Sequence, residues 1–282
     1  MTNSAPQAYN VGPMPLSSTL STYAKTALTK SAQTWMVVAI FGQWIFLAYI
    51  LSLYGGSAIS GNFDGWNNVI PEGFVPGRTA GNIAVGIHVG LAVLIFMAGT
   101  LQFIPYIRTH FPTFHRWTGR SYVMTAIFTS LAGLFMIATR ETSGGGLQRL
   151  GISLDAALIF IFSILAWHFA IIRKFEQHKR WVIRLFIVVS AVWFFRIGIM
   201  AWVIIHKAPV GFDPESFTGP FLNFLSFAQY IIPLAFVELY FWAHRQNNTV
   251  ITIAVTAAIV CATLLTALGI FAATMGMWLP KM

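Results

Sequence analysis

Charged side chains are scarce in this chain: Asp, Glu, Lys and Arg together make up 9% of its 282 residues. Soluble domains carry about 25%, so the chain has too little charge to cover itself with a polar surface. Hydrophobic residues make up 57%, and the mean hydropathy is +0.71. The composition therefore predicts a protein that is solvated by lipid, and it excludes an ordinary soluble domain.

Cysteine is almost absent as well. Cys261 is the only one, which excludes an intrachain disulfide framework and a Cys-rich metal cluster. The sequence also lacks a serine nucleophile elbow, an H-E-x-x-H zinc motif and a P-loop, so familiar membrane hydrolases and transferases are disfavoured. The last apolar segment contains no lysine, which argues against a light-driven protein with a retinal Schiff base.

What the chain has in quantity is long apolar segments. Spanning a bilayer takes about 20 helical residues, and seven segments reach that length. They predict an all-α, polytopic membrane helical bundle with seven transmembrane helices. The polar residues 1–32 are expected to be a disordered cytoplasmic tail, and residues 33–282 a single transmembrane domain with its core at 81–205. The segments are Trp35–Leu53, Gly81–Ile104, Ser121–Thr139, Gly151–Ile172, Val182–Ile205, Pro220–Ala243 and Val250–Met277.

The loop charges predict the orientation. Eleven Lys and Arg residues fall on one side of the predicted spans and five on the other. Because basic loops stay in the cytoplasm, we expect a cytoplasmic N-terminus, an external C-terminus and a place in the inner (plasma) membrane. The same rule explains the net charge of +9 without nucleic acid as a partner. Basic turns at this surface are also suited to anionic lipid headgroups.

The most distinctive feature is a motif, Arg-Trp-x-x-Arg, that occurs twice. Each copy opens a predicted span and is led by a histidine, His115 or His178. Two histories are compatible with this pattern, a duplicated helical hairpin or two turns that converged on one basic-aromatic boundary. The arginines of the two copies are Arg116 and Arg120, and Arg180 and Arg184.

These two copies and a third histidine predict a cofactor site at the cytoplasmic surface. His168 lies about one turn from the cytoplasmic end of the fourth span, while His115 and His178 begin the third and fifth spans. Transmembrane b-type cytochromes hold haem between helices through axial histidines. The cluster is compatible with one haem b; if it binds haem, we expect His168 to be one axial ligand, with His115 or His178 opposite. The propionates would lie near Arg116, Arg120, Arg180 and Arg184.

A second polar group is expected inside the membrane. Arg196 lies in the middle of the fifth span and His88 within the second. Intramembrane ionisable residues usually face the bundle interior and pair there. Gln102, fourteen positions after His88, falls near the same helical face. The three residues predict one buried polar site, although His88 alone is also compatible with a neutral imidazole bonded to a neighbouring helix. Asp155 is an alternative partner for Arg196.

Several of these pieces occur together in one known family. Leu101-Gln102-Phe103-Ile104-Pro105, the stretch from His115 to Tyr122 and the stretch from His178 to Arg184 resemble the bacterial integral-membrane family catalogued as domain of unknown function 2306. The resemblance covers His88 to Arg196. It implies a multi-pass inner-membrane protein of unassigned function. In outline its layout is similar to b-type cytochromes of the ascorbate and ferric-reductase kind, but this chain departs from their two-and-two histidine arrangement.

Three functions remain open from the sequence. The first is haem b- or quinone-linked electron transfer with a redox partner, using the His/Arg clusters. The second is a transporter or carrier for a small anionic or amphipathic ligand, with Arg196 and His88 lining its path. The third is a non-catalytic membrane assembly or sensory component. Absorption of visible light by the purified protein separates the first from the others.

Overall fold

The computed structural model of the chain describes residues 16–69, 73–139 and 145–282. These residues form helices joined by turns, and no β-strand occurs among them, so the predicted all-α class is confirmed. The elements are α1 Leu16–Ile50, η1 Leu51–Gly55, α2 Gly56–Ile59, η2 Phe63–Asn68, α3 Thr79–Leu101, α4 Pro105–His110, α5 Pro112–Thr139, α6 Gly146–Ile171, α7 Phe175–Val189, α8 Ala191–His206, α9 Pro220–Arg245, α10 Thr249–Ala273, η3 Thr274–Trp278 and η4 Leu279–Lys281.

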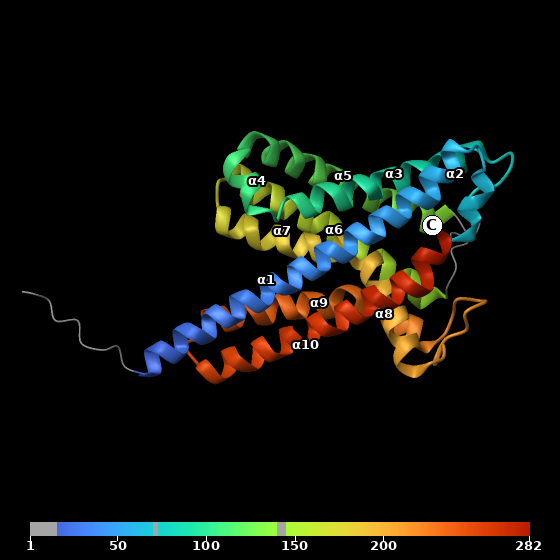
Figure 1. The fold of residues 1–282 in the computed structure, drawn as a ribbon. Coiled ribbons are helices and arrows are strands. Elements are labelled where there is room, and N and C mark those ends of the chain that lie inside the picture. The colour runs from blue at the N-terminus through green and yellow to red at the C-terminus, as the bar shows by residue number, and fades with distance from the viewer. Residues whose placement is uncertain (1–15, 70–72, 140–144) are drawn as a thin grey trace, which may run out of the picture.

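The helices form two groups with the long helix α1 between them (Figure 1). In the first group α5 packs on α3, α6 on α5 and α7 on α6; in the second, α8, α9 and α10 pack on one another. α1 contacts α3 of the first group and α9 and α10 of the second. Both Arg-Trp-x-x-Arg copies lie at one end of the bundle, termed the motif end, and residues 61–69 and 73–80 lie at the opposite, cap end (Figure 1).

Several of these helices are suited to cross a membrane. Within the described residues, five helical stretches are long and apolar enough, and α7 with α8 adds a sixth if the pair counts as one bent span. This agrees with the composition, since the chain buries polar backbone in helices and leaves apolar side chains for lipid. The five stretches are 19–59, 79–101, 146–171, 220–245 and 249–281.

The predicted fifth span is broken at Ser190. α7 and α8 meet there at 52°. Sharp helix bends arise at Pro or Gly/Ser positions, or where a side chain enters the backbone ladder. Here the hydroxyl of Ser190 donates to the carbonyl of Phe186 at 2.7 Å and accepts from the Gln43 amide of α1 at 2.9 Å. A polar contact with another helix therefore accompanies the break.

The expected polar tail is helical over residues 16–32, which are the first turns of α1, while residues 1–15 lie outside the described chain. Leu28 explains the extension. Its side chain is fully buried and packs with Ala243 of α9 and with Val255 and Ile259 of α10. Apolar burial against two other helices therefore overrides the polar local composition that predicted disorder.

A glycine on α3 allows the close packing of α3 on α5. A Cβ atom built at Gly99 would lie 2.8 Å from the ring of Tyr122, too close for any side chain. Tyr122 is itself buried in the core of the first helix group. Small residues at membrane helix interfaces permit this kind of approach.

The segment at the cap end packs on the helices. Trp66 is buried, and its indole Nε1 donates to the carbonyl of Tyr54 at 3.2 Å. Its ring also packs against the Tyr54 ring, with centroids 5.9 Å apart. The segment therefore closes the cap end over α1 and α3.

Candidate functional site

The two motif copies adopt the same local geometry. In the first, the guanidinium carbon of Arg120 lies 5.1 Å from the centre of the Trp117 ring, and in the second that of Arg184 lies 4.7 Å from Trp181. Residues three apart on a helix are neighbours, so the spacing of the motif produces a cation–π contact within each copy. Cation–π contacts at exposed sites contribute about 0.5–1 kcal/mol.

The surroundings of the copies differ. Arg184 forms a two-point ion pair with Glu238 of α9, with distances of 2.6 Å (Nε–Oε1) and 3.0 Å (Nη2–Oε2). Arg180 lies over Phe241 of the same helix at 5.4 Å. In the first copy Arg116 bonds only its own helix, donating to the Pro112 carbonyl at 3.2 Å. The second copy is thus docked on α9, while the arginines of the first are exposed.

His115 of α5 and His178 of α7 lie close enough at the motif end for their charges to interact. The His178 Nδ1 atom is 2.9 Å from the carbonyl oxygen of Ala166 and donates to it, because a carbonyl only accepts. In the neutral ring, Nε2 then carries no proton and can bind a metal. The Nδ1 atom of His115 is buried without a hydrogen-bond partner among the described residues. Two imidazoles from different helices thus each have an unused nitrogen.

Electrostatics favours the neutral form of His115. Burial lowers the pKa of His115 below its usual 6.5, and the neighbouring Arg108 and His178 lower it further. Neutral imidazole is the form that binds metals. In the described chain, no three or more His, Cys, Asp or Glu side chains are grouped to hold a metal ion.

The structure does not bring His168 to this pair. Its side chain is exposed, and its ring packs edge-on against Phe169 with centroids 5.3 Å apart. No interaction joins it to His115 or His178 within the described residues. Counting residues from the end of the span gives the height of His168 along α6, but not the direction in which its side chain points.

Arg196 has an aromatic and polar environment. Its Nη1 donates to the Val192 carbonyl at 3.0 Å, and its guanidinium carbon lies 5.4 Å from the centre of the Phe46 ring. Tyr49 and Tyr54 of the first membrane-crossing stretch and His88 of α3 are within electrostatic reach. The described residues contain one ion pair, Arg184 with Glu238, so no described carboxylate pairs with Arg196.

Two buried polar atoms that lack partners in the described chain belong to residues of this region: His88, which interacts electrostatically with Arg196, and Trp278, which packs on the Phe46 ring that Arg196 lies over. The His88 Nδ1 atom is buried with no hydrogen-bond partner among the described residues, and so is the indole Nε1 of Trp278. Trp278 packs against Phe46 and Tyr49, with ring centroids 5.2 and 6.2 Å apart. Buried polar groups normally have partners, so this region has unmet capacity for a polar ligand or water.

Gln102 belongs elsewhere. Its Nε2 donates to the hydroxyl of Thr118 at 2.8 Å, and its side chain lies beside Gly119 on α5. Fourteen residues of helix separate it from His88, about 21 Å at 1.5 Å per residue. This axial distance, together with the bond to Thr118, separates Gln102 from the Arg196 group. Asp155 is likewise not paired with Arg196, and one of its carboxylate oxygens is buried without a partner among the described residues.

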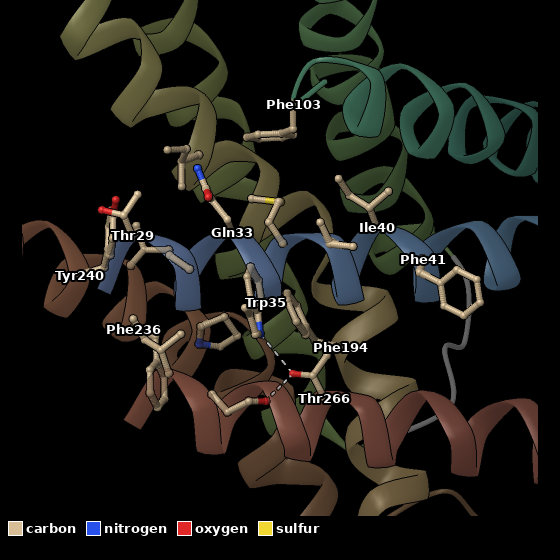
Figure 2. A pocket seen from close by; sticks show the side chains of 18 of the residues that line it. Thr29, Gln33, Trp35, Ile40, Phe41, Phe103, Phe194, Phe236, Tyr240 and Thr266 are labelled. Carbon is tan, nitrogen blue, oxygen red and sulfur yellow. Dashed lines mark hydrogen bonds between the residues drawn. The ribbon is translucent and has the colours of Figure 1, made fainter. Parts of the chain in front are cut away.

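A large cavity lies along α1 and was not predicted from the sequence. Termed the α1 groove, it has a volume of about 1220 Å³ and is lined by α1, α8, α9, α10, the motif-end part of α7, and residues 103–105, which lead from the end of α3 into α4. Figure 2 shows Thr29, Gln33 and Tyr240 toward one end and Phe41 toward the other. Trp35 donates to the Thr266 hydroxyl at 3.2 Å within it. Side chains of six helices form this groove, so the apolar periodicity of any one helix does not predict it.

Residues 85–214 match the family model described as "Predicted membrane protein (DUF2306)". The matched stretch contains both motif copies, the His115–His178 pair and Arg196, so the resemblance inferred from these residues is confirmed. No curated protein and no solved structure matches the chain. The chain is therefore a membrane protein with several membrane-spanning helices.

Proposed function

Starting from the match to the DUF2306 family of predicted membrane proteins, we propose that the chain binds haem b at the motif end and transfers electrons within the membrane. The observation that carries the proposal is the pairing of His115 and His178 from α5 and α7. Transmembrane b-type cytochromes bind haem between helices through two such imidazoles. When bound, haem supplies one-electron oxidation and reduction.

The hydrogen bond of His178 supports the ligand role. Metal-binding histidines almost always donate their second ring nitrogen to a carboxylate, backbone carbonyl or water. His178 does this through Nδ1 to Ala166. The bond fixes the tautomer and orients the ring, and it leaves Nε2 for iron.

The other requirements of haem agree with the residues present. A porphyrin would supply four nitrogen ligands to its iron, so two protein side chains such as His115 and His178 would complete the set. Its propionates are anionic, and Arg108 and Arg180 are cationic groups of the same end of the bundle. The axial-ligand role that the sequence suggested for His168 is proposed here for His115 and His178 instead.

We also propose the topology that this function needs. α5 is 28 residues long, about 42 Å at 1.5 Å per residue, and exceeds the hydrocarbon thickness of about 30 Å. Counting α5 and the bent pair α7–α8 gives seven spans. With the motif end cytoplasmic, as the basic residues favour, the N-terminus is cytoplasmic, the C-terminus external and the bilayer the inner membrane.

The test is an absorption spectrum of detergent-purified protein from haem-replete cells. A Soret band is expected for the wild type and is expected to be lost in His115→Ala and His178→Ala. His168→Ala and His110→Ala are matched controls from the same end of the bundle and should keep the band. Circular dichroism confirms that each variant is folded. A colourless wild type, or a band that only His168→Ala removes, contradicts the proposal.

The Arg196 region favours a second candidate, a carrier for a small anionic ligand. A guanidinium without a described carboxylate partner, lying over the Phe46 ring that also packs against Trp278, provides donors for an anion. Binding of inorganic phosphate or a short carboxylate should raise the thermal stability of the wild type and not that of Arg196→Gln. An equal effect on both proteins excludes this role.

A further inference from the structure

The α1 groove has the shape of a site for a long, narrow ligand. Its lining follows α1 from Thr29 to Trp44, about 22 Å at 1.5 Å per residue, whereas one leaflet of hydrocarbon is about 15 Å thick. Its volume of about 1220 Å³ exceeds the roughly 300–1,000 Å³ of ordinary small-molecule pockets. An extended apolar chain fits these dimensions.

Most polar side chains of the groove lie at one end; farther along, the Thr266 hydroxyl is already bonded to Trp35 and to the Ala262 carbonyl. Thr29, Gln33, Lys179 and Tyr240 lie at the motif end of their helices, and the remainder of the lining is mainly aliphatic and aromatic. Gln33, Lys179 and Tyr240 can each donate a hydrogen bond. The ligand should therefore have an apolar tail and a head that accepts hydrogen bonds.

The charge of the lining distinguishes a neutral head from an anionic one. Among the described lining residues Lys179 is the only charged side chain. Sites for anionic lipid headgroups contain clusters of Lys and Arg, so a phosphate would be poorly matched. Phe103, Tyr240 and Phe241 instead offer aromatic faces or edges to a flat ring.

The polar end also adjoins the proposed haem ligand. Lys179 follows His178 in α7, and Phe103 packs edge-on against Phe186 of the same helix, with centroids 4.7 Å apart. We infer that the α1 groove binds a lipid-soluble quinone, with its isoprenoid tail along α1 and its carbonyl-bearing ring beside Gln33 and Lys179. The role of this quinone as redox partner rests on the proposed haem function, but its binding does not.

Binding is measured by titrating purified protein with a benzoquinone that carries a decyl tail and following tryptophan fluorescence, because Trp35 and Trp44 line the groove. Saturable quenching is expected. Neighbouring alanines of α10 provide a matched pair: Ala258 lines the groove, whereas Ala257 is exposed outside it. Ala258→Phe should weaken binding at least tenfold and Ala257→Phe should leave it unchanged. Non-saturable quenching in the wild type, or equal affinities of the two variants, overturns the inference.

Separate variants test how the polar head of the ligand is bound and whether that head is charged. Gln33→Leu removes a donor and should weaken quinone binding about tenfold, the equivalent of about 1.4 kcal/mol. Lys179→Gln keeps a donor and should change it less than threefold. If phosphatidylglycerol in mixed micelles displaces the quinone and Lys179→Gln abolishes that displacement, the groove is an anionic phospholipid site and the quinone assignment is wrong.

The same titration on His178→Ala separates the two proposals. Quenching should persist there, because the groove does not include His178. A wild type without a Soret band that still binds quinone refutes the haem proposal alone. A haem-containing wild type without saturable quenching refutes the quinone site alone.

Discussion

The guanidinium carbon of Arg196 lies 5.4 Å from the centre of the Phe46 ring, so an aromatic side chain of α1 covers a cation of α8. The contact joins two helices that belong to different parts of the bundle. A cation–π contact removed from water contributes about 2 kcal/mol. Placing an arginine at the centre of a membrane helix costs about 2.5–3.5 kcal/mol even on the lenient insertion scale. The ring therefore offsets only part of the cost of the charge.

The first prediction concerns Arg196→Leu. Since the charge costs more than its described contacts return, the variant should be as stable as the wild type or more stable by about 1–2 kcal/mol. Thermal unfolding in detergent measures this, with Arg196→Lys, which keeps the charge, as the control. A loss of more than about 3 kcal/mol would show that Arg196 is a paired structural cation.

The second prediction concerns the coupling of Arg196 with His88. Because the two groups interact electrostatically, the effects of Arg196→Leu and His88→Ala should not be additive. A double-mutant cycle of unfolding free energies should give a coupling of about 0.5–3 kcal/mol. Arg196→Leu combined with His110→Ala is the control, since His110 is exposed on α4 at the motif end, and its effects should add. Strict additivity for His88 as well would mean two separate sites.

The third prediction tests the N-terminal part of α1. Leu28 is fully buried, whereas Leu20 on the same helix is 61% exposed. Leu28→Ala should reduce the free energy of unfolding by about 2–5 kcal/mol, and Leu20→Ala should change it by less than about 0.5 kcal/mol. Equal small effects would indicate that residues 16–32 are not docked on α9 and α10.

The fourth prediction is the orientation. In a Cys261→Ala background, Ser60→Cys places an exposed thiol at the cap end and Gln177→Cys places one at the motif end. An impermeant maleimide added to intact cells should label the first and not the second, because the basic turns are expected in the cytoplasm. The reverse pattern would invert the topology, and labelling after lysis confirms that both thiols react.

Much of the fold could be predicted because helix periodicity and apolar length are local properties. The predicted segment Gly81–Ile104 corresponds to α3, Thr79–Leu101, and Pro220–Ala243 to α9, Pro220–Arg245. The break at Ser190 could not be predicted, because its partner Gln43 is 147 residues away in the chain. The helical state of residues 16–32 likewise depends on the distant residues that bury Leu28.

The candidate sites were predictable in composition but not in geometry. The motif identified His115 and His178, and the structure places them near enough for their charges to interact. The sequence grouped His168 with His115 and His178 by depth in the membrane, and Gln102 with His88 by helical face. Placing a side chain requires both its depth and its direction. The α1 groove is formed by side chains of six helices, so no single segment contains a signal for it.

The hydrogen bond between Gln43 and Ser190 has a consequence for biogenesis. Ribosomes add about 5–20 residues per second, so the 147 residues between the two partners take roughly 7–30 s to synthesise. During that time α1 has to enter the bilayer with an amide whose native partner does not yet exist. An unsatisfied amide in hydrocarbon is costly, which favours retention of α1 beside a polar surface of the insertion machinery until α7 emerges. Completion of the bend is therefore a late event, and release of α1 into lipid should wait for it.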